Sequence, residues 1–189
     1  TECFTLPILE HCRRNADTDG VKAILIYPMN ALANDQATRL ATFIAQNRET
    51  IGDVRVGLYA DAEPESAATQ MRADSVITDR ETIRQDPPDI LITNYKMLDH
   101  MLVLPRDRPL WAENGPETLK YLVVDELHTF DGAQGTDLAC LIRRLKARLQ
   151  TPENYLCCIG TSATLGTETG DLRTFAGRLF GEPFDGDAV

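Results

Sequence analysis

The feature that most constrains the fold is a short apolar run that ends on two adjacent acids. Residues 121–124 are Tyr-Leu-Val-Val, and Asp125 and Glu126 follow directly. A run that is apolar at every position is typical of a strand buried in a parallel sheet. In open α/β sheets, ligands bind just beyond the carboxyl ends of the strands. The run therefore predicts that both acids face a ligand and its metal, although a strand ending on a solvated acidic pair has the same sequence pattern.

The rest of the chain alternates between short apolar runs and longer segments with helical spacing. Four more strands are predicted at 21–27, 54–59, 89–92 and 155–159, and helices at 1–12, 32–44, 78–85, 95–103, 138–149 and 171–180. Such alternation favours an α/β fold, with a mainly parallel sheet flanked by helices on both faces. We expect one domain over residues 1–189.

Polar residues just before the predicted helices are candidate caps. Asn30, Thr78 and Thr93 each precede a helical segment, and Glu81 is the expected capping-box partner of Thr78. Residues 61–75 are predicted as a loop or a frayed helix and residues 105–116 as a loop, and we expect Trp111, the single tryptophan, to be a packed anchor in the second segment.

Composition limits the kinds of partner that the chain can have. The net charge is −10, from 19 basic and 29 acidic residues, which argues against coating nucleic acid by bulk charge. A narrow strip of amides and polar side chains that grips phosphates remains compatible with this charge. Without a bilayer-length apolar run or a secretion leader, we expect no membrane partner and a cytoplasmic location. The five cysteines lack CxxC spacing, and we expect most of them to be buried thiols.

Polar segments follow four of the predicted strands. Because parallel strands end at the same edge of a sheet, these segments should share one rim. Helix capping and turn formation would also account for the polar residues, and capping is compatible with phosphate binding at helix N-termini. The four segments are Pro28-Met29-Asn30, Thr93-Asn94-Tyr95, Asp125-Glu126-Leu127-His128 and Ser162-Ala163-Thr164.

In order and spacing, these segments resemble the first RecA-like domain of a superfamily 2 helicase of the DEAD/DEAH-box type. DELH at 125–128 matches motif II, SAT at 162–164 matches motif III, YPMNALANDQ at 27–36 resembles motif Ia, and TNY at 93–95 resembles motif Ib. The longer sequences DILITNYKML and DELHTF are also similar to those of bacterial DNA-repair helicases with a C-terminal zinc-binding domain. A lone DExH is a weak signal, whereas four segments in order over nearly the whole chain are specific.

The resemblance implies ATP and Mg²⁺ as cofactors and assigns roles to the acid segment. Asp125 would hold Mg²⁺ through water, and Glu126 would act as general base toward the attacking water. His128 would hydrogen-bond to the hydroxyls of Ser162 and Thr164, on either side of Ala163, and so report the nucleotide state. The alternative interpretation is that His128 is an ordinary polar residue at the start of a helix or loop, without a functional role.

The resemblance also implies a nucleic-acid partner. DNA is favoured over RNA only because these sequences are similar to those of DNA-repair helicases. The segments after the first and third strands would grip the sugar–phosphate backbone without reading bases. The expected contacts are Pro28, Asn30, Gly57, Thr93 and Asn94.

One element of the family pattern is missing from the sequence. No G-x-x-x-x-G-K-[ST] segment, the phosphate-binding P-loop, is present, and the chain opens on Thr1-Glu2-Cys3-Phe4 without a methionine. This opening resembles the GKT-E-x-F of such helicases, so we expect Thr1 to bind the cofactor and its metal, in a fragment that lacks its P-loop strand. A second RecA-like domain of the same chain would complete the site, and residues 1–189 alone should lack ATPase activity.

The function that these features favour is the motor domain of an ATP-dependent nucleic-acid helicase or translocase. A superfamily 2 ATPase that remodels DNA without separating strands, such as a defence-system motor, is compatible with the same motifs. A non-catalytic α/β scaffold is a third interpretation, but a scaffold has no chemical need for both carboxylates.

Overall fold

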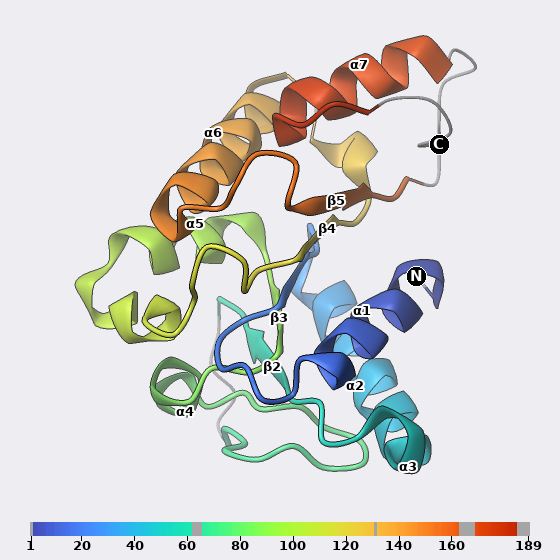
Figure 1. The fold of residues 1–189 in the computed structure, drawn as a ribbon, viewed down its shortest axis with the longest axis vertical. Coiled ribbons are helices and arrows are strands. Elements are labelled where there is room, and N and C mark those ends of the chain that lie inside the picture. Colours follow the sequence, from blue (N-terminus) through green and yellow to red (C-terminus); the bar gives the residue numbers. More distant parts are fainter. Residues whose placement is uncertain (1, 62–65, 131, 163–168, 185–189) are drawn as a thin grey trace.

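The computed structural model describes residues 2–61, 66–130, 132–162 and 169–184. Within this part of the chain, five parallel strands form one sheet in the order β2-β3-β1-β4-β5 (Figure 1). They are β1 (Ala23–Ile26), β2 (Val56–Tyr59), β3 (Ile90–Thr93), β4 (Tyr121–Val124) and β5 (Cys157–Gly160). The predicted α/β fold with a parallel sheet is confirmed. β4 has the predicted bounds, and each of the other four strands is shorter than its apolar run or shifted by up to two residues.

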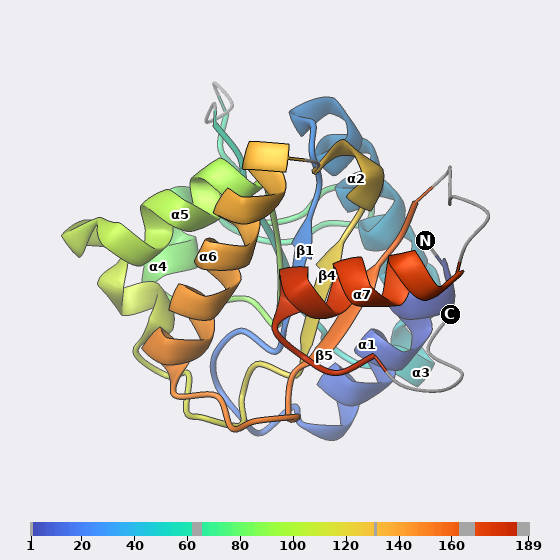
Figure 2. The same cartoon turned by 90° about the horizontal axis from the view of Figure 1, so that it is seen from above.

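Helices cover both faces of the sheet (Figures 1 and 2). The α-helices are α1 (Glu2–Arg14), α2 (Asn30–Gln46), α3 (Arg48–Ile51), α4 (Arg80–Gln85), α5 (Tyr95–Val103), α6 (Gly132–Leu149) and α7 (Thr169–Phe180). Two 3₁₀ segments are η1 (Pro105–Trp111) and η2 (Leu127–Thr129). None of the helices among the described residues has the length and apolar character required to span a membrane.

The alternation of side chains along the strands divides the core into two layers. On one face, Ala23 and Leu25 of β1 pack with apolar residues of α1, α2 and α3. On the other face, Ile24 and Ile26 pack with apolar residues of α4, α5, α6 and α7. Because every residue of β1 is buried, the strand has no polar face, as its continuous apolar sequence predicted.

The helix caps differ from the prediction by one residue in each case. Asn30 is the first residue of α2, and Met29 is its cap without a side-chain hydrogen bond. Asp79, not Thr78, caps α4, by accepting a hydrogen bond from the Thr82 amide at 2.7 Å. The predicted capping box with Glu81 is therefore wrong. It fails because the Thr78 hydroxyl instead accepts a hydrogen bond from the Ala68 amide.

The third cap prediction, Thr93 for α5, is also wrong. Asn94 caps this helix, with its Oδ1 accepting from the Met97 amide at 2.9 Å. Thr93 is still part of β3, where its carbonyl accepts from the Tyr27 amide and its hydroxyl donates to the Tyr59 carbonyl. Trp111 is buried in η1 and donates to the Met101 carbonyl, so it packs as expected within a 3₁₀ segment rather than an irregular loop.

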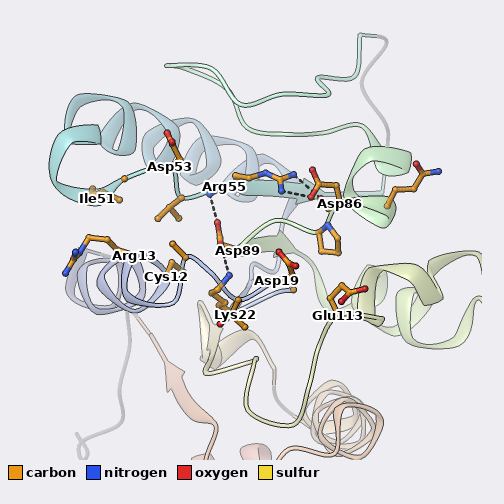
Figure 3. A pocket seen from close by; sticks show the side chains of 17 residues that line it. Cys12, Arg13, Asp19, Lys22, Ile51, Asp53, Arg55, Asp86, Asp89 and Glu113 are labelled. Atoms are coloured by element: carbon orange, nitrogen blue, oxygen red, sulfur yellow. Dashed lines mark hydrogen bonds and ion pairs between the residues drawn. The ribbon is translucent and has the colours of Figure 1, made fainter.

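The edge of the sheet where the strands begin is fixed by ion pairs (Figure 3). Lys22, 3% exposed, meets Asp89 with 2.6 Å between Nζ and Oδ1, and the other oxygen of Asp89 accepts from the Arg55 amide at 2.8 Å. Arg55 also pairs with Asp86. These groups line a hollow of about 470 Å³. Because they bind each other, we interpret this region as a clamp that joins the starts of β1, β2 and β3.

Candidate functional site

The acid pair lies at the end of β4, between the ends of β1 and β5. The Asp125 amide donates to the Ile26 carbonyl at 2.9 Å and so continues the ladder with β1. The Thr161 hydroxyl, just after β5, donates to Asp125 Oδ1. Asp125 is therefore held from both neighbouring strands. Sequence reasoning missed Thr161, and the only available signal was a hydroxyl at the end of a strand that runs parallel to the acid strand.

Glu126 has a left-handed backbone conformation that residues other than glycine seldom adopt, with φ 52°. The chain is fixed on both sides of it, because the Leu127 amide donates to the Thr161 carbonyl at 2.7 Å. Strained backbone of this kind clusters at functional sites, where surrounding contacts enforce it. The turn thus ends the strand abruptly and starts η2 one residue later.

His128 links the acid segment to the residues that follow β5. Its Nδ1 lies 3.1 Å from Ser162 Oγ and 3.2 Å from Glu126 Oε2. We assign the ring proton to Nδ1, because a lone pair there would face the carboxylate. The structure thus brings His128 to Ser162, whereas Ala163 and Thr164 lie outside the described residues, as does Thr1.

Glu126 keeps unused capacity to accept a hydrogen bond. Its Oε2 is buried and has no hydrogen-bond partner among the described residues, because the nearby His128 nitrogen is at ion-pair distance without hydrogen-bond geometry. Buried polar atoms without a partner are uncommon and costly. The side chain as a whole is 34% exposed. An acceptor of this kind fits a group that receives a proton or orients a water.

The negative charge of Asp125 affects the phenol of Tyr27, which directly follows the neighbouring strand β1. Burial, and then the negative charge of Asp125, raise the pKa of Tyr27 above its ordinary value. The phenol is therefore neutral at physiological pH and does not add a second negative charge to the acid pair. Tyr27 is 1% exposed.

A second group of polar side chains lies along the same edge, at the ends of β1, β2 and β3. Asn94 Nδ2 donates to Asn30 Oδ1 at 2.8 Å, and both amides donate to Asp61 Oδ2. These residues line a hollow of about 250 Å³. Its walls are Pro28, Asn30, Asp61, Asn94, Tyr95, Lys96, Thr129, Phe130 and Gln134.

Two of the expected contacts do not reach this hollow. Gly57 is buried within β2, and a Cβ there would lie 2.7 Å from Pro88 Cγ. Its lack of a side chain therefore serves packing of the strand beside Pro88, and Gly57 does not line the hollow. Thr93 is 0% exposed, because its hydroxyl is used inside the sheet. Asp61 and Lys96 line the hollow although sequence reasoning missed them.

An aromatic contact connects the two groups. The rings of Tyr95 and Phe130 meet edge to face, with centroids 5.7 Å apart. Tyr95 follows the Asn94 cap, and Phe130 follows η2 and the DELH segment. The rim thus has an acidic part around Asp125 and an amide-lined part around Asn94, with one packed contact between them.

Comparison with known proteins places this rim in a family context. A family model described as DEAD/DEAH box helicase matches residues 1–172. The chain is 28% identical to Druantia protein DruE of Escherichia coli (strain UMEA 4076-1), over 88% of this chain and 14% of DruE. It is 33% identical to YprA of Bacillus subtilis (strain 168), named an uncharacterized ATP-dependent helicase, over 92% of this chain and 21% of YprA.

A solved structure shares the fold. The crystal structure of the DUF1998 helicase MrfA bound to DNA and AMPPNP matches with a TM-score of 0.68 and 28% sequence identity. The match covers 96% of this chain and 22% of that chain. The chain thus spans less than a quarter of each of these three proteins.

Proposed function

This chain belongs to the DEAD/DEAH box helicase family, and we propose that it is the ATP-hydrolysing motor domain of a DNA helicase or translocase. The observation that carries the proposal is the junction at the ends of β4 and β5. There, Thr161 holds Asp125, and His128 lies within 3.2 Å of both Glu126 and Ser162. A packing scaffold has no need for two adjacent carboxylates, one of them with an unmet acceptor.

In this proposal, Glu126 is the general base that orients the attacking water. Its buried Oε2 has unused acceptor capacity, while a third of the side chain is open to solvent. A positioned base of this kind contributes roughly 10²–10⁴ to a rate. His128, with its proton on Nδ1, hydrogen-bonds to Ser162 and lies 3.2 Å from Glu126 Oε2, so that a shift of Ser162 would move a group beside the base.

The residues present fit a magnesium ion better than a softer metal. Mg²⁺ prefers oxygen ligands and keeps most of its waters, so a single carboxylate is sufficient from the protein side. Asp125 would hold it, because Thr161 occupies only Oδ1 and fixes the carboxylate in place. When bound, the ion would neutralise charge on the phosphates of ATP. We retain Thr1 as a proposed further ligand and Thr164 as a second partner of His128.

The amide-lined hollow is the proposed seat of the nucleic-acid backbone. Pro28, Asn30 and Asn94 line it, and the first amides of α5 are unpaired within the helix by geometry. Such amides bind phosphate oxygens well. Exposed Lys96 adds a positive charge at the same place. Phosphate contacts of this type hold a strand without reading its sequence.

The preference for DNA and the need for a second RecA-like domain are also proposals. The family relation and the DNA named with the MrfA structure support DNA as the strand that is bound. Closure of the nucleotide site by a second domain of the same chain would supply the positive charge that phosphoryl transfer needs.

The test is ATP hydrolysis by the natural full-length protein with single-stranded DNA, duplex DNA or RNA. We expect single-stranded DNA to raise the rate roughly tenfold or more, a coupling of ordinary size for linked sites. The control is the Glu126→Gln variant purified in the same way, which measures background ATP hydrolysis by contaminating enzymes. Equal rates with and without every nucleic acid would contradict the proposal, and stimulation by RNA alone would contradict its DNA part.

A further inference from the structure

An acid that belongs to none of the sequence motifs joins the two asparagines of the amide-lined hollow. Asp61 follows β2, and its Oδ2 accepts from Asn30 Nδ2 at 2.9 Å and from Asn94 Nδ2 at 3.1 Å. A carboxylate is unexpected beside a site for phosphates, because like charges repel. Its position therefore needs a reason other than charge complementarity.

The hydrogen bonds form a chain with one direction. The Met97 amide donates to Asn94 Oδ1, Asn94 Nδ2 donates to Asn30 Oδ1, and Asn30 Nδ2 donates to Asp61. The chain begins at a backbone donor, which cannot accept, and ends at a carboxylate, which cannot donate. With both ends fixed, turning over the Asn30 amide breaks two bonds, and turning over the Asn94 amide breaks three.

The backbone of Asp61 is itself held in place, by the side chain of Arg80. Arg80 donates to the Ala60 carbonyl at 2.6 Å and to the Asp61 carbonyl at 2.9 Å. The same guanidinium lies 5.1 Å from the centre of the Tyr59 ring. The end of the hydrogen-bond chain is thus attached to β2, whereas its start belongs to α5.

The network leaves a defined donor for a ligand. Both amide hydrogens of Asn94 are directed at Asn30 and Asp61, and one hydrogen of Asn30 is directed at Asp61. The second amide hydrogen of Asn30 remains, next to the first amides of α5. Without Asp61, a single bond from Asn94 Nδ2 would hold the Asn30 amide, and a turned Asn30 would present its oxygen, which repels a phosphate.

We propose that Asp61 is a positioning residue for nucleic-acid binding, which together with Asn94 fixes the Asn30 amide so that its remaining hydrogen is available to the phosphate backbone. This inference rests on the proposed function and adds to it a residue outside the motifs. Charge alone predicts the opposite effect of removing Asp61. Loss of a negative charge near phosphates would tighten binding, whereas loss of a positioning group weakens it.

The experiment measures the affinity of the natural full-length protein for a fluorescein-labelled oligothymidylate by anisotropy. We expect Asp61→Ala to bind about tenfold more weakly than wild type, a loss of about 1.4 kcal/mol. Asp61→Asn keeps an acceptor and should recover part of this affinity. The double variant with Asn30→Ala should bind within about twofold of Asn30→Ala alone, because the two residues act as one unit.

The matched control is Asp53→Ala. Asp53 is also exposed and also bonded to a side chain, Arg48, but it lines the clamp at the opposite edge of the sheet (Figure 3). This variant should bind like wild type, and thermal unfolding should show that both variants fold. Equal or tighter binding by Asp61→Ala, with normal wild-type binding, would overturn this inference alone. Absence of DNA binding and stimulation in wild type would overturn the proposed function and this inference with it.

Discussion

The position of the proposed base depends on one strained residue. Glu126 adopts φ 52°, and the hydrogen bonds of its neighbours Asp125 and Leu127 to other strand ends hold it there. A non-glycine residue in such a region costs on the order of 1–3 kcal/mol, which the surrounding structure must offset. At this residue the chain turns from the end of β4 into η2.

Cysteines provide a prediction at the scale of single side chains. The expectation that most of them are buried is wrong, because Cys3, Cys140 and Cys157 are exposed. Burial raises the pKa of Cys12 and of Cys158 to about 12. Since the thiolate is the reactive form, both should resist iodoacetamide at pH 8 in the folded protein.

Peptide mass spectrometry checks this order of reactivity. Cys12 and Cys158 should be modified only after denaturant is added, in the same preparation in which surface thiols react at once. Rapid modification of Cys12 in the native protein would contradict the burial of its thiol on the side of α1 that packs against the sheet.

Sequence alone predicted some site residues and missed others for a physical reason. Asp125, Glu126 and His128 stand directly after a strand whose apolar pattern is unmistakable. Thr161 and Asp61 become significant only through partners 36 and 31 residues away, Asp125 and Asn30. Such partners depend on which strands are neighbours, and no local pattern reports that order.

At the scale of elements, a buried polar network ties α4 and η1 to β2. Asp107, 1% exposed, accepts from Arg84 Nε at 2.6 Å and from the Tyr59 hydroxyl at 2.8 Å. Burial opposes the charge of Arg84, yet its bonds to Asp107 and Tyr59 raise its pKa overall. The network was invisible in the sequence, where residues 105–116 indicated only a charged loop.

Removing Asp107 should therefore be costly. Asp107→Ala leaves the guanidinium of Arg84 without its buried carboxylate partner, and we expect a loss of about 3–5 kcal/mol in the free energy of unfolding. Glu81→Ala is the matched control, because Glu81 pairs with the same arginine at 3.2 Å but is 64% exposed. An exposed pair contributes about 0–1 kcal/mol.

Urea denaturation of the full-length protein and its two variants measures both values. A similar, small loss in the two variants would show that Asp107 is not an essential partner of Arg84. A transition that shifts to clearly lower urea concentration in Asp107→Ala, with little shift in Glu81→Ala, is the result that the buried network predicts.

At the scale of the whole molecule, the two edges of the sheet have different tasks. The edge where strands begin is closed by paired charges, Lys22 with Asp89 and Arg55 with Asp86. The edge where they end carries side chains with unused hydrogen-bond capacity, as at Glu126. Alternation of strands and helices predicted the shared rim at the strand ends, because parallel strands all end at one edge, but it did not predict the ion pairs at the other edge. The order β2-β3-β1-β4-β5 was not predictable from alternation, since it depends on which faces pack.

The central claim is that this edge hydrolyses ATP with Glu126 as base, and Glu126→Gln in the full-length protein tests it most directly. The substitution keeps the size of the side chain and removes its ability to take a proton. With saturating single-stranded DNA, we expect turnover to fall by about 10²-fold or more, while the affinity for a fluorescent ATP analogue changes less than about threefold. Turnover that persists, or nucleotide affinity that falls in parallel with turnover, would contradict the claim.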